Sequence, residues 1–124
     1  MKRNKDLGLL ILRVGISALF LGHGIGKFLD FVNGNTEVGG DPIGLGGLLS
    51  SILVIIAEFI APVLIIIGLK TRIAAIFPVI AMAVAAFVVH ANDSLEDKEM
   101  ALLYMVGFLA ISIMGAGRFS LDKR

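Results

Sequence analysis

An apolar stretch from Leu48 to Leu69 carries a single charge, Glu58, close to its midpoint. About 20 apolar residues in a helix span the hydrocarbon core of a bilayer, so this stretch is predicted to cross a membrane. A carboxylate at that depth costs about 2.5–3.5 kcal/mol on insertion scales, and intramembrane charges commonly mark functional sites. We therefore expect Glu58 to face other polar groups inside the protein.

Composition indicates that the rest of the chain is also embedded in a membrane. The chain is 57% hydrophobic, and its charges gather between apolar segments, whereas a soluble helical domain would interleave them. The sequence predicts an all-α integral membrane protein, a four-helix bundle running up-down-up-down, with residues 1–124 as a single domain. Its helices are expected at about residues 7–29, 48–69, 73–91 and 100–116.

The positions of lysine and arginine predict the orientation in the membrane. Basic residues precede the first segment, fill the turn between the second and third, and follow the fourth, whereas the other two connections are mainly acidic. By the positive-inside rule, both termini are expected in the cytoplasm, and the protein is a multi-pass protein of the inner or plasma membrane. A cleaved signal peptide is disfavoured because Arg13 interrupts the first apolar stretch.

Several classes of site are not indicated. The chain has no cysteine, so it provides neither disulfides nor thiolate metal ligands, and we expect no metal site. The glycine-rich loop at 33–47 lacks the Gly-Lys-Ser/Thr of a phosphate loop, and the glycines at 22–26 lie inside a span rather than after a strand. The net charge of +1 gives no indication of a nucleic-acid partner.

A helical wheel divides the first segment into two faces. At 100° per residue, Lys27 lies about 40° and His23 about 80° from Arg13 in the same direction, so these groups form one polar stripe. The opposite face is smooth, and small residues spaced in this way allow close helix approach, either within the bundle or between two copies in a homo-oligomer. The smooth face consists of Gly15, Ala18, Gly22 and Gly26.

Helix direction suggests partners for Glu58. Side chains lean toward the N-terminus of their own helix, so His23 leans inward, Glu58 leans outward, and the two are expected to meet. His23 is the preferred partner, although the length of an arginine side chain also permits an Arg13–Glu58 pair. Lys27 and His90 are placed above, near the outer end. His23, Lys27, Glu58 and His90 are therefore the candidate residues of a pocket for proton transfer or ligand binding.

The three interior or flanking arginines, Arg13, Arg72 and Arg118, are expected to have structural roles. Arg13 either forms an ion pair or extends to the inner interface. The basic C-terminal tail either anchors the last helix to anionic headgroups or uses its Ser-Leu-Asp to dock on the turn at residues 70–72. The sequence leaves both alternatives open.

The chain resembles the DoxX family of small four-helix membrane proteins over nearly its whole length. The similar motifs are Leu12-Arg13, His23-Gly24-x-x-Lys27, the mid-helix Glu58, Gly68-Leu69-Lys70-Thr71-Arg72, His90 and the tail Gly115-Ala116-Gly117-Arg118-Phe119-Ser120-Leu121-Asp122. Ala116 replaces the family's usual proline, and Ala61-Pro62 replaces small glycine-rich residues, which suggests a kink after Glu58.

The resemblance implies a membrane subunit linked to redox chemistry, with a quinone as a candidate substrate; no resident cofactor is indicated. An imidazole and a membrane-buried carboxyl are suitable groups for protonating quinone oxygens. Without a cysteine cluster or haem motif, electrons would come from a redox partner protein or a soluble donor. Two alternatives remain open: a non-enzymatic scaffold or assembly protein, and a small proton or solute transporter.

Overall fold

A computed structural model describes residues 2–35, 44–89, 92 and 94–122 of the chain. Four helical rods account for most of these residues, and the described part contains no strand. The second rod is α2, η1 and α3 in continuous succession, and the third is α4 followed by η2. The elements are α1 (Lys2–Val32), α2 (Gly47–Ile55), η1 (Ile56–Ile60), α3 (Ala61–Ile67), α4 (Thr71–Val84), η2 (Ala85–Val89) and α5 (Leu95–Met114).

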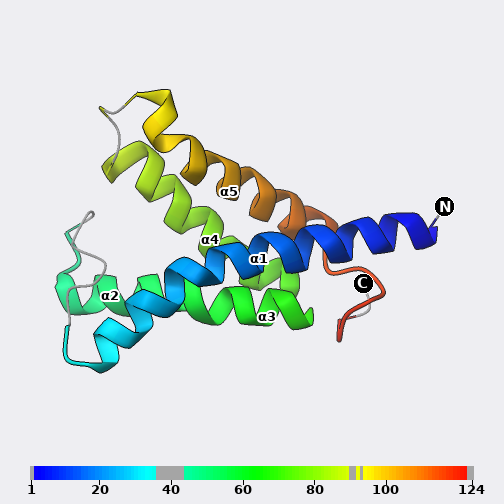
Figure 1. Ribbon diagram of the computed structural model, residues 1–124, viewed down its shortest axis with the longest axis horizontal. Coiled ribbons are helices and arrows are strands. Elements are labelled where there is room, and N and C mark those ends of the chain that lie inside the picture. Colours follow the sequence, from blue (N-terminus) through cyan, green and yellow to red (C-terminus); the bar gives the residue numbers. More distant parts are fainter. Residues whose placement is uncertain (1, 36–43, 90–91, 93, 123–124) are drawn as a thin grey trace.

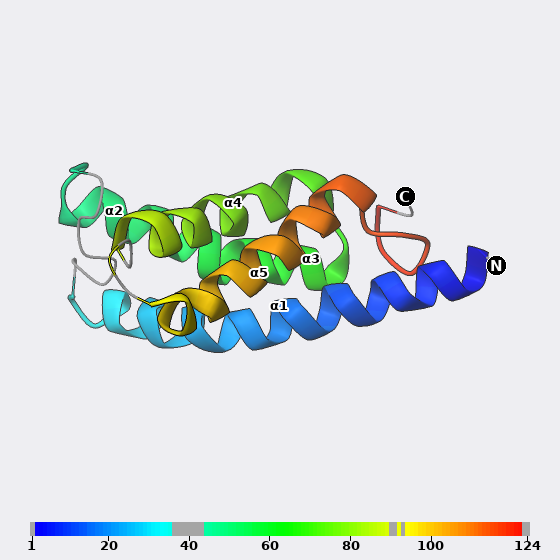
Figure 2. The same ribbon diagram turned by 90° about the horizontal axis from the view of Figure 1, so that it is seen from above.

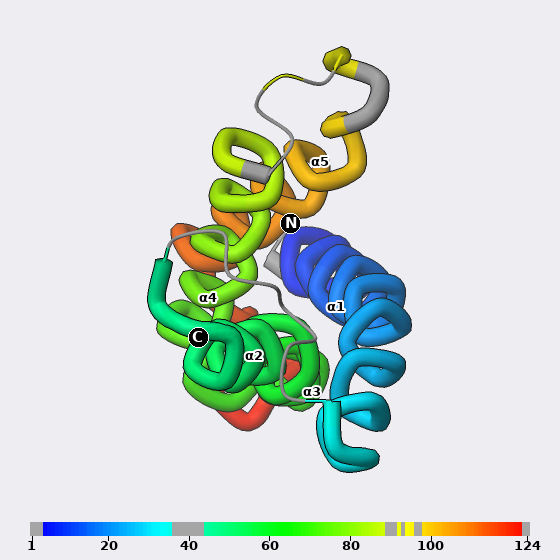
Figure 3. Tube along the Cα trace, turned by 90° about the vertical axis from the view of Figure 1, so that its left-hand side faces the viewer, coloured from blue at the N-terminus to red at the C-terminus, as the bar shows by residue number. Residues whose placement is uncertain are grey.

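Successive rods run in opposite directions along the long axis of the bundle (Figure 1). The start of α1 and the C-terminal tail consequently lie at the same end of the molecule (Figure 2). Viewed along the bundle, α4 lies between α3 and α5, and α1 flanks them on one side (Figure 3). Which end faces the cytoplasm stays a prediction from the charge distribution.

Within the part of the chain that the structure describes, three rods are long and apolar enough to cross a membrane: Asn4–Val32, Gly47–Ile67 and Thr71–Val88. The expected fourth span, 100–116, differs from the helix observed. α5 begins at Leu95, with charged residues throughout its first turn, and ends before Gly115, whose φ of 84° leaves the helical region.

A π-helical turn interrupts the second rod at Glu58. The N–H of Ala61 donates to the carbonyl of Ile56, five residues earlier, as in a π-helix. Pro62 has no N–H, so the carbonyl of Glu58 loses its ordinary α-helical donor. The predicted irregularity around Ala61-Pro62 therefore takes the form of a π turn, a feature often found at functional sites.

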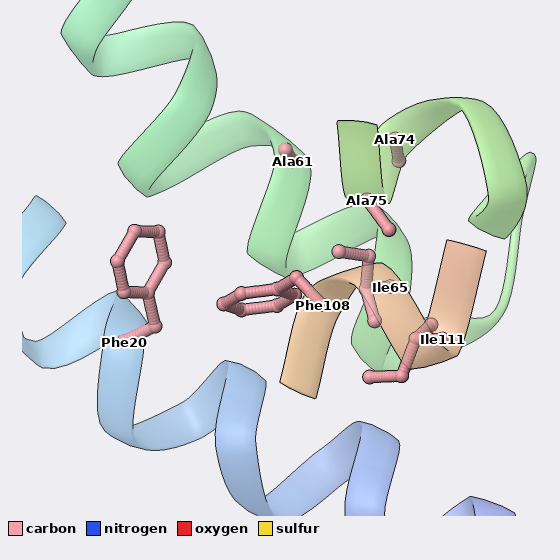
Figure 4. Packing of buried hydrophobic residues seen from close by; sticks show 7 residues of the cluster. All are labelled: Phe20, Ala61, Ile65, Ala74, Ala75, Phe108 and Ile111. Atoms are coloured by element: carbon pink, nitrogen blue, oxygen red, sulfur yellow. The ribbon is translucent and has the colours of Figure 1, made fainter. Parts of the chain in front are cut away.

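The apolar core joins all four rods (Figure 4). Phe20 of α1 meets Phe108 of α5 edge-on, with ring centroids 5.0 Å apart. Alanines on the facing helices allow the backbones to approach closely. The buried cluster consists of Phe20, Ala61, Ile65, Ala74, Ala75, Phe108 and Ile111.

The C-terminal segment Gly115–Asp122, here called the clasp, folds back onto the turn between α3 and α4. The two carboxylate oxygens of Asp122 accept hydrogen bonds from the N–H groups of Lys70 and Thr71, each at 2.8 Å. The N–H of Asp122 donates to the carbonyl of Gly68. An anion at a helix N-terminus satisfies free N–H groups and favours the helix dipole. Of the two alternatives for the tail, docking on this turn is the one observed.

Arg13 connects α1 to the clasp. Its buried guanidinium donates to the carbonyls of Ile65 and Ile66, each at 2.8 Å, and to that of Phe119 at 2.6 Å. The expectations of a pair with Glu58 or an extension to the interface were therefore wrong. The last carbonyls of α3 lack helical donors, and the negative end of the helix attracts a cation.

The other two arginines differ from each other in environment. Arg72 donates to the carbonyls of Ile113 and Met114 at the end of α5, so its bonds are to backbone rather than to a carboxylate. Arg118 is exposed, and none of the ion pairs seen in the described part of the chain involves it.

Candidate functional site

Lys27 and Glu58 form an ion pair between α1 and the π turn of the second rod. The ammonium Nζ of Lys27 lies 2.8 Å from Oε2 of Glu58. The Glu58 side chain is only 6% exposed, whereas that of Lys27 is 40% exposed. The polar partner predicted for Glu58 is therefore present, but it is Lys27 rather than His23.

His23 lies at the rim and makes no ion pair with Glu58. Its exposed ring packs edge-on against Tyr104 of α5, with centroids 6.1 Å apart and planes at 85°. Lys27 is closer than His23 to the interior direction of α1, and its four-carbon stem covers the extra distance along the axis. The length of the Lys27 side chain and its position around α1 therefore decide which residue pairs with Glu58, rather than the direction in which the side chains lean. His90, the remaining candidate, lies outside the described residues.

The pair opens into a cleft of about 240 Å³ to which every rod contributes. Its polar side comprises His23, Lys27 and Glu58. Its apolar side was not predicted, because the residues that form it are uncharged and resemble the many other apolar residues of the chain. This side consists of Phe20, Met82, Ala85, Met100, Ala101 and Tyr104.

Gly24 sets the distance between α1 and the π turn. A Cβ at this position would collide with the carbonyl oxygen of Glu58, so the two backbones are in direct contact. Gly24 was not predicted to be a contact residue, although the wheel places it about 20° from Arg13, on the interior face. Beside it, the rings of Phe28 and Phe59 stack with centroids 4.4 Å apart. These contacts hold the residues adjacent to the ion pair in register.

The smooth face of α1 makes no close contact within the described chain. A Cβ added at Gly15, Gly22 or Gly26 would have no neighbour within 4 Å, and Ala18 is exposed. The expectation of a helix contact there within the bundle was wrong. The reason is geometric: the polar stripe must face inward, which turns the opposite face toward the bilayer.

The cleft offers an ammonium, a carboxylate, an imidazole and a phenol around an apolar floor. Such a combination can orient a carbonyl or an ionised oxygen and exchange protons with it. Over the residues that the structure describes, no three histidine, aspartate or glutamate side chains gather as metal ligands.

Comparison with known proteins places the chain among membrane proteins. The DoxX family model matches residues 8–91. The chain belongs to the DoxX family. It is 30% identical to the inner membrane protein YqjF of Escherichia coli, over 99% of this chain and 95% of that protein. It is 32% identical to an uncharacterized protein of Haemophilus influenzae, over 94% of this chain and 89% of that protein. No solved structure matches it significantly.

This DoxX protein is thus a multi-pass inner membrane protein, as its spans predicted. The region matched by the family contains Arg13, Lys27 and Glu58, together with the π turn. Tyr104 and the clasp lie beyond it. The polar side of the cleft therefore belongs to the family-matched part of the chain, and part of its apolar side lies outside.

Proposed function

We propose that this DoxX protein binds a quinone-type ring in the cleft and acts as a subunit of a membrane redox system. The observation that carries the proposal is the Lys27–Glu58 pair, which places a partly exposed ammonium beside a buried carboxylate within a largely apolar cleft. Buried or intramembrane charges of this kind are costly and are by default assigned a functional role.

The size and lining of the cleft suit one ring rather than a large ligand. Its volume of about 240 Å³ is slightly below that of common small-molecule pockets, which hold about 300–1,000 Å³. Phe20, Met82 and Tyr104 offer aromatic and thioether surface for a flat ring. An aliphatic tail on such a ring would extend into the bilayer.

The proposed chemistry requires an electron source outside the chain. A quinone becomes a quinol by taking up two electrons and two protons. A reduced partner protein or soluble donor would supply the electrons, while Lys27 would stabilise negative charge that develops on a quinone oxygen. Glu58 and His23 would pass protons to the two oxygens.

Tyr104 provides a direct test of binding. The chain has one tyrosine and no tryptophan, so its intrinsic fluorescence reports from the cleft. Titration of the purified protein with decylubiquinone should give saturable quenching. The double variant Lys27→Met/Glu58→Gln, which keeps Tyr104, should bind at least about tenfold more weakly, the loss expected for ~1.4 kcal/mol. Identical, non-saturating quenching of both proteins would contradict the proposal.

The orientation and the partners belong to the same proposal. With the basic ends in the cytoplasm, the cleft would lie toward the outer half of the membrane, because its lining residues on α1 and α5 fall in the halves of these helices that are remote from the clasp. Reporter fusions at both termini, with cytoplasmic activity expected, test the orientation. A redox partner protein, or a second copy on the smooth face of α1, would complete the proposed assembly.

A second candidate is a scaffold protein with no ligand. The Phe28–Phe59 stack beside the Lys27–Glu58 pair favours it, because adjacent specific contacts fix the register of two helices. In that case Glu58→Leu should lower thermal stability or recovery of a larger complex, and wild type and variant should quench alike with decylubiquinone.

A further inference from the structure

The two members of the Lys27–Glu58 pair differ in their freedom to reach a ligand. Glu58 is held in the π turn, against the backbone of Gly24, and is nearly covered. Lys27 ends a flexible stem with three donors and has more than a third of its side chain exposed. A ligand that enters the cleft therefore meets the ammonium first.

Lys27 cannot turn to another anion without consequences for Glu58. A buried carboxylate without a partner is costly enough that it is neutralised by a proton instead. Among the residues that the structure describes, the other groups around the cleft that can carry charge are His23 on α1 and Tyr104 on α5, while α4 and η2 contribute Met82 and Ala85. In the described part of the chain, no further lysine or arginine lines the cleft to take the place of Lys27.

We infer that the cleft binds an apolar organic anion against Lys27 and that each such event loads one proton onto Glu58. The ionised oxygen of the ligand replaces the Glu58 carboxylate as the partner of the ammonium. A proton from solution neutralises Glu58, so anion and proton enter together and the net charge of the cleft stays unchanged. The protein would thereby couple binding of an organic anion to proton uptake.

This inference rests on the proposed ligand site and names its ligand class. The class is a single aromatic ring or short aliphatic body with one ionised oxygen, such as an aromatic carboxylate or a phenolate. The apolar side of the cleft favours the body, and Lys27 favours the charge. A deprotonated, reduced quinone belongs to this class, whereas an uncharged quinone would leave the Lys27–Glu58 pair intact.

Calorimetry on the full-length protein in lipid nanodiscs tests the coupling. The probe is 4-butylbenzoate, and its uncharged isostere 4-butylbenzamide is the control. Between about pH 6 and 8 the benzoate stays ionised, because carboxyl groups in water titrate near 4. Titrations in buffers of different ionisation enthalpy should show uptake of one proton per benzoate. The benzoate Kd should rise by up to about tenfold per pH unit. Neither effect is expected for the benzamide.

Variants identify the group that takes up the proton. Glu58→Gln should bind the benzoate without proton uptake and with a Kd that does not change with pH. Histidine also changes charge in this range, so His23→Gln is measured as well: whatever its affinity for the benzoate, each benzoate that binds should still take up one proton. Lys27→Met/Glu58→Gln should bind the benzoate at least about tenfold more weakly.

Four other results of these titrations bear on the proposal. Benzoate binding without proton uptake, or uptake that vanishes in His23→Gln but persists in Glu58→Gln, overturns the coupling. If decylubiquinone binds and benzoate does not, the proposed function stands and the coupling falls. If neither binds, both fall. Should Glu58→Gln fail to fold, the proton count of the wild-type protein decides alone.

Discussion

Gly24 lies directly against the carbonyl oxygen of Glu58, in the space that any other residue would fill with a Cβ. Pro62 denies that same carbonyl an ordinary α-helical partner, so the chain bulges into a π turn where α1 comes closest. The backbone contact and the π turn together place Glu58 within reach of Lys27. The cleft therefore depends on a residue that carries no chemistry itself.

Replacement of Gly24 should damage the protein far more than replacement of a neighbouring glycine. Gly24→Ala forces α1 away from the π turn, and overpacking of this kind costs about 1–3 kcal/mol. Gly22→Ala is the matched control, because it lies on the same helix with no atom within 4 Å of its Cβ. It should be neutral or stabilising by up to about 1 kcal/mol. Free energies of unfolding in mixed micelles compare the two, and equal losses would refute the contact.

The ion pair should show strong coupling between its members. Lys27→Met leaves Glu58 buried without a partner, which we expect to cost about 2–3 kcal/mol, below the ~3–5 of fully buried pairs because Lys27 is partly exposed. Adding Glu58→Gln removes the unpaired charge and should restore part of that stability. A double-mutant cycle on unfolding free energies measures the coupling. Additive losses would mean that the two side chains act independently.

The clasp should contribute to stability through Asp122. Asp122→Ala removes the acceptor of two N–H groups at the start of α4, and loss of a helix cap costs about 0.5–2 kcal/mol. Arg118→Ala, an exposed change in the same segment, should stay within about 0.5 kcal/mol. Thermal unfolding followed by circular dichroism separates them. A loss for Arg118→Ala as large as that for Asp122→Ala would argue against the cap.

Arg13 should not tolerate even a conservative change. A lysine ammonium lacks the planar fork that reaches the carbonyls of Ile65, Ile66 and Phe119 together. We expect Arg13→Lys to cost about 1–3 kcal/mol, the range for unmade buried hydrogen bonds. Limited proteolysis should also cleave the C-terminal segment faster in the variant. An unchanged cleavage rate would show that Arg13 does not hold the clasp.

The smooth face of α1 can be tested by cross-linking. The chain has no cysteine, so Gly22→Cys introduces a single reactive group into an exposed face. If two copies meet there, mild oxidation of membranes should give a disulfide-linked dimer. Ile113→Cys, on an exposed position of α5, is the control and should stay monomeric. Dimer formation by both cysteine variants, or by neither, would argue against a contact between two copies on the smooth face of α1.

Predictions from the sequence were accurate where they depended on the local helical pattern. The wheel placed Arg13 and Lys27 on the interior face, and a single charge in an apolar run identified Glu58. The predicted partner of Glu58 was wrong. Side-chain length and the register of the two helices decide which residue reaches the carboxylate, and the direction in which side chains lean gives neither. His23 lies at the edge of the same stripe and accordingly reaches only the rim of the cleft.

Contacts between residues far apart in the chain could not be predicted from the sequence. Arg13 bonds to Phe119, 106 residues away, and nothing near either residue indicates the other. The wheel puts Gly22 and Gly24 on opposite faces of the first helix, but it does not show that the backbone of Glu58 lies against Gly24. The apolar side of the cleft, including Tyr104, depends on how α4 and α5 pack, which an apolar sequence leaves unspecified.

The most direct measurement is photolabelling of the membrane-embedded protein with an azidoquinone, followed by mass spectrometry of its peptides. We expect adducts on residues that line the cleft, such as Lys27, Met100 and Tyr104, and we expect excess unlabelled quinone to suppress them. Adducts confined to the smooth face of α1, or adducts that unlabelled quinone does not suppress, would contradict the proposed function.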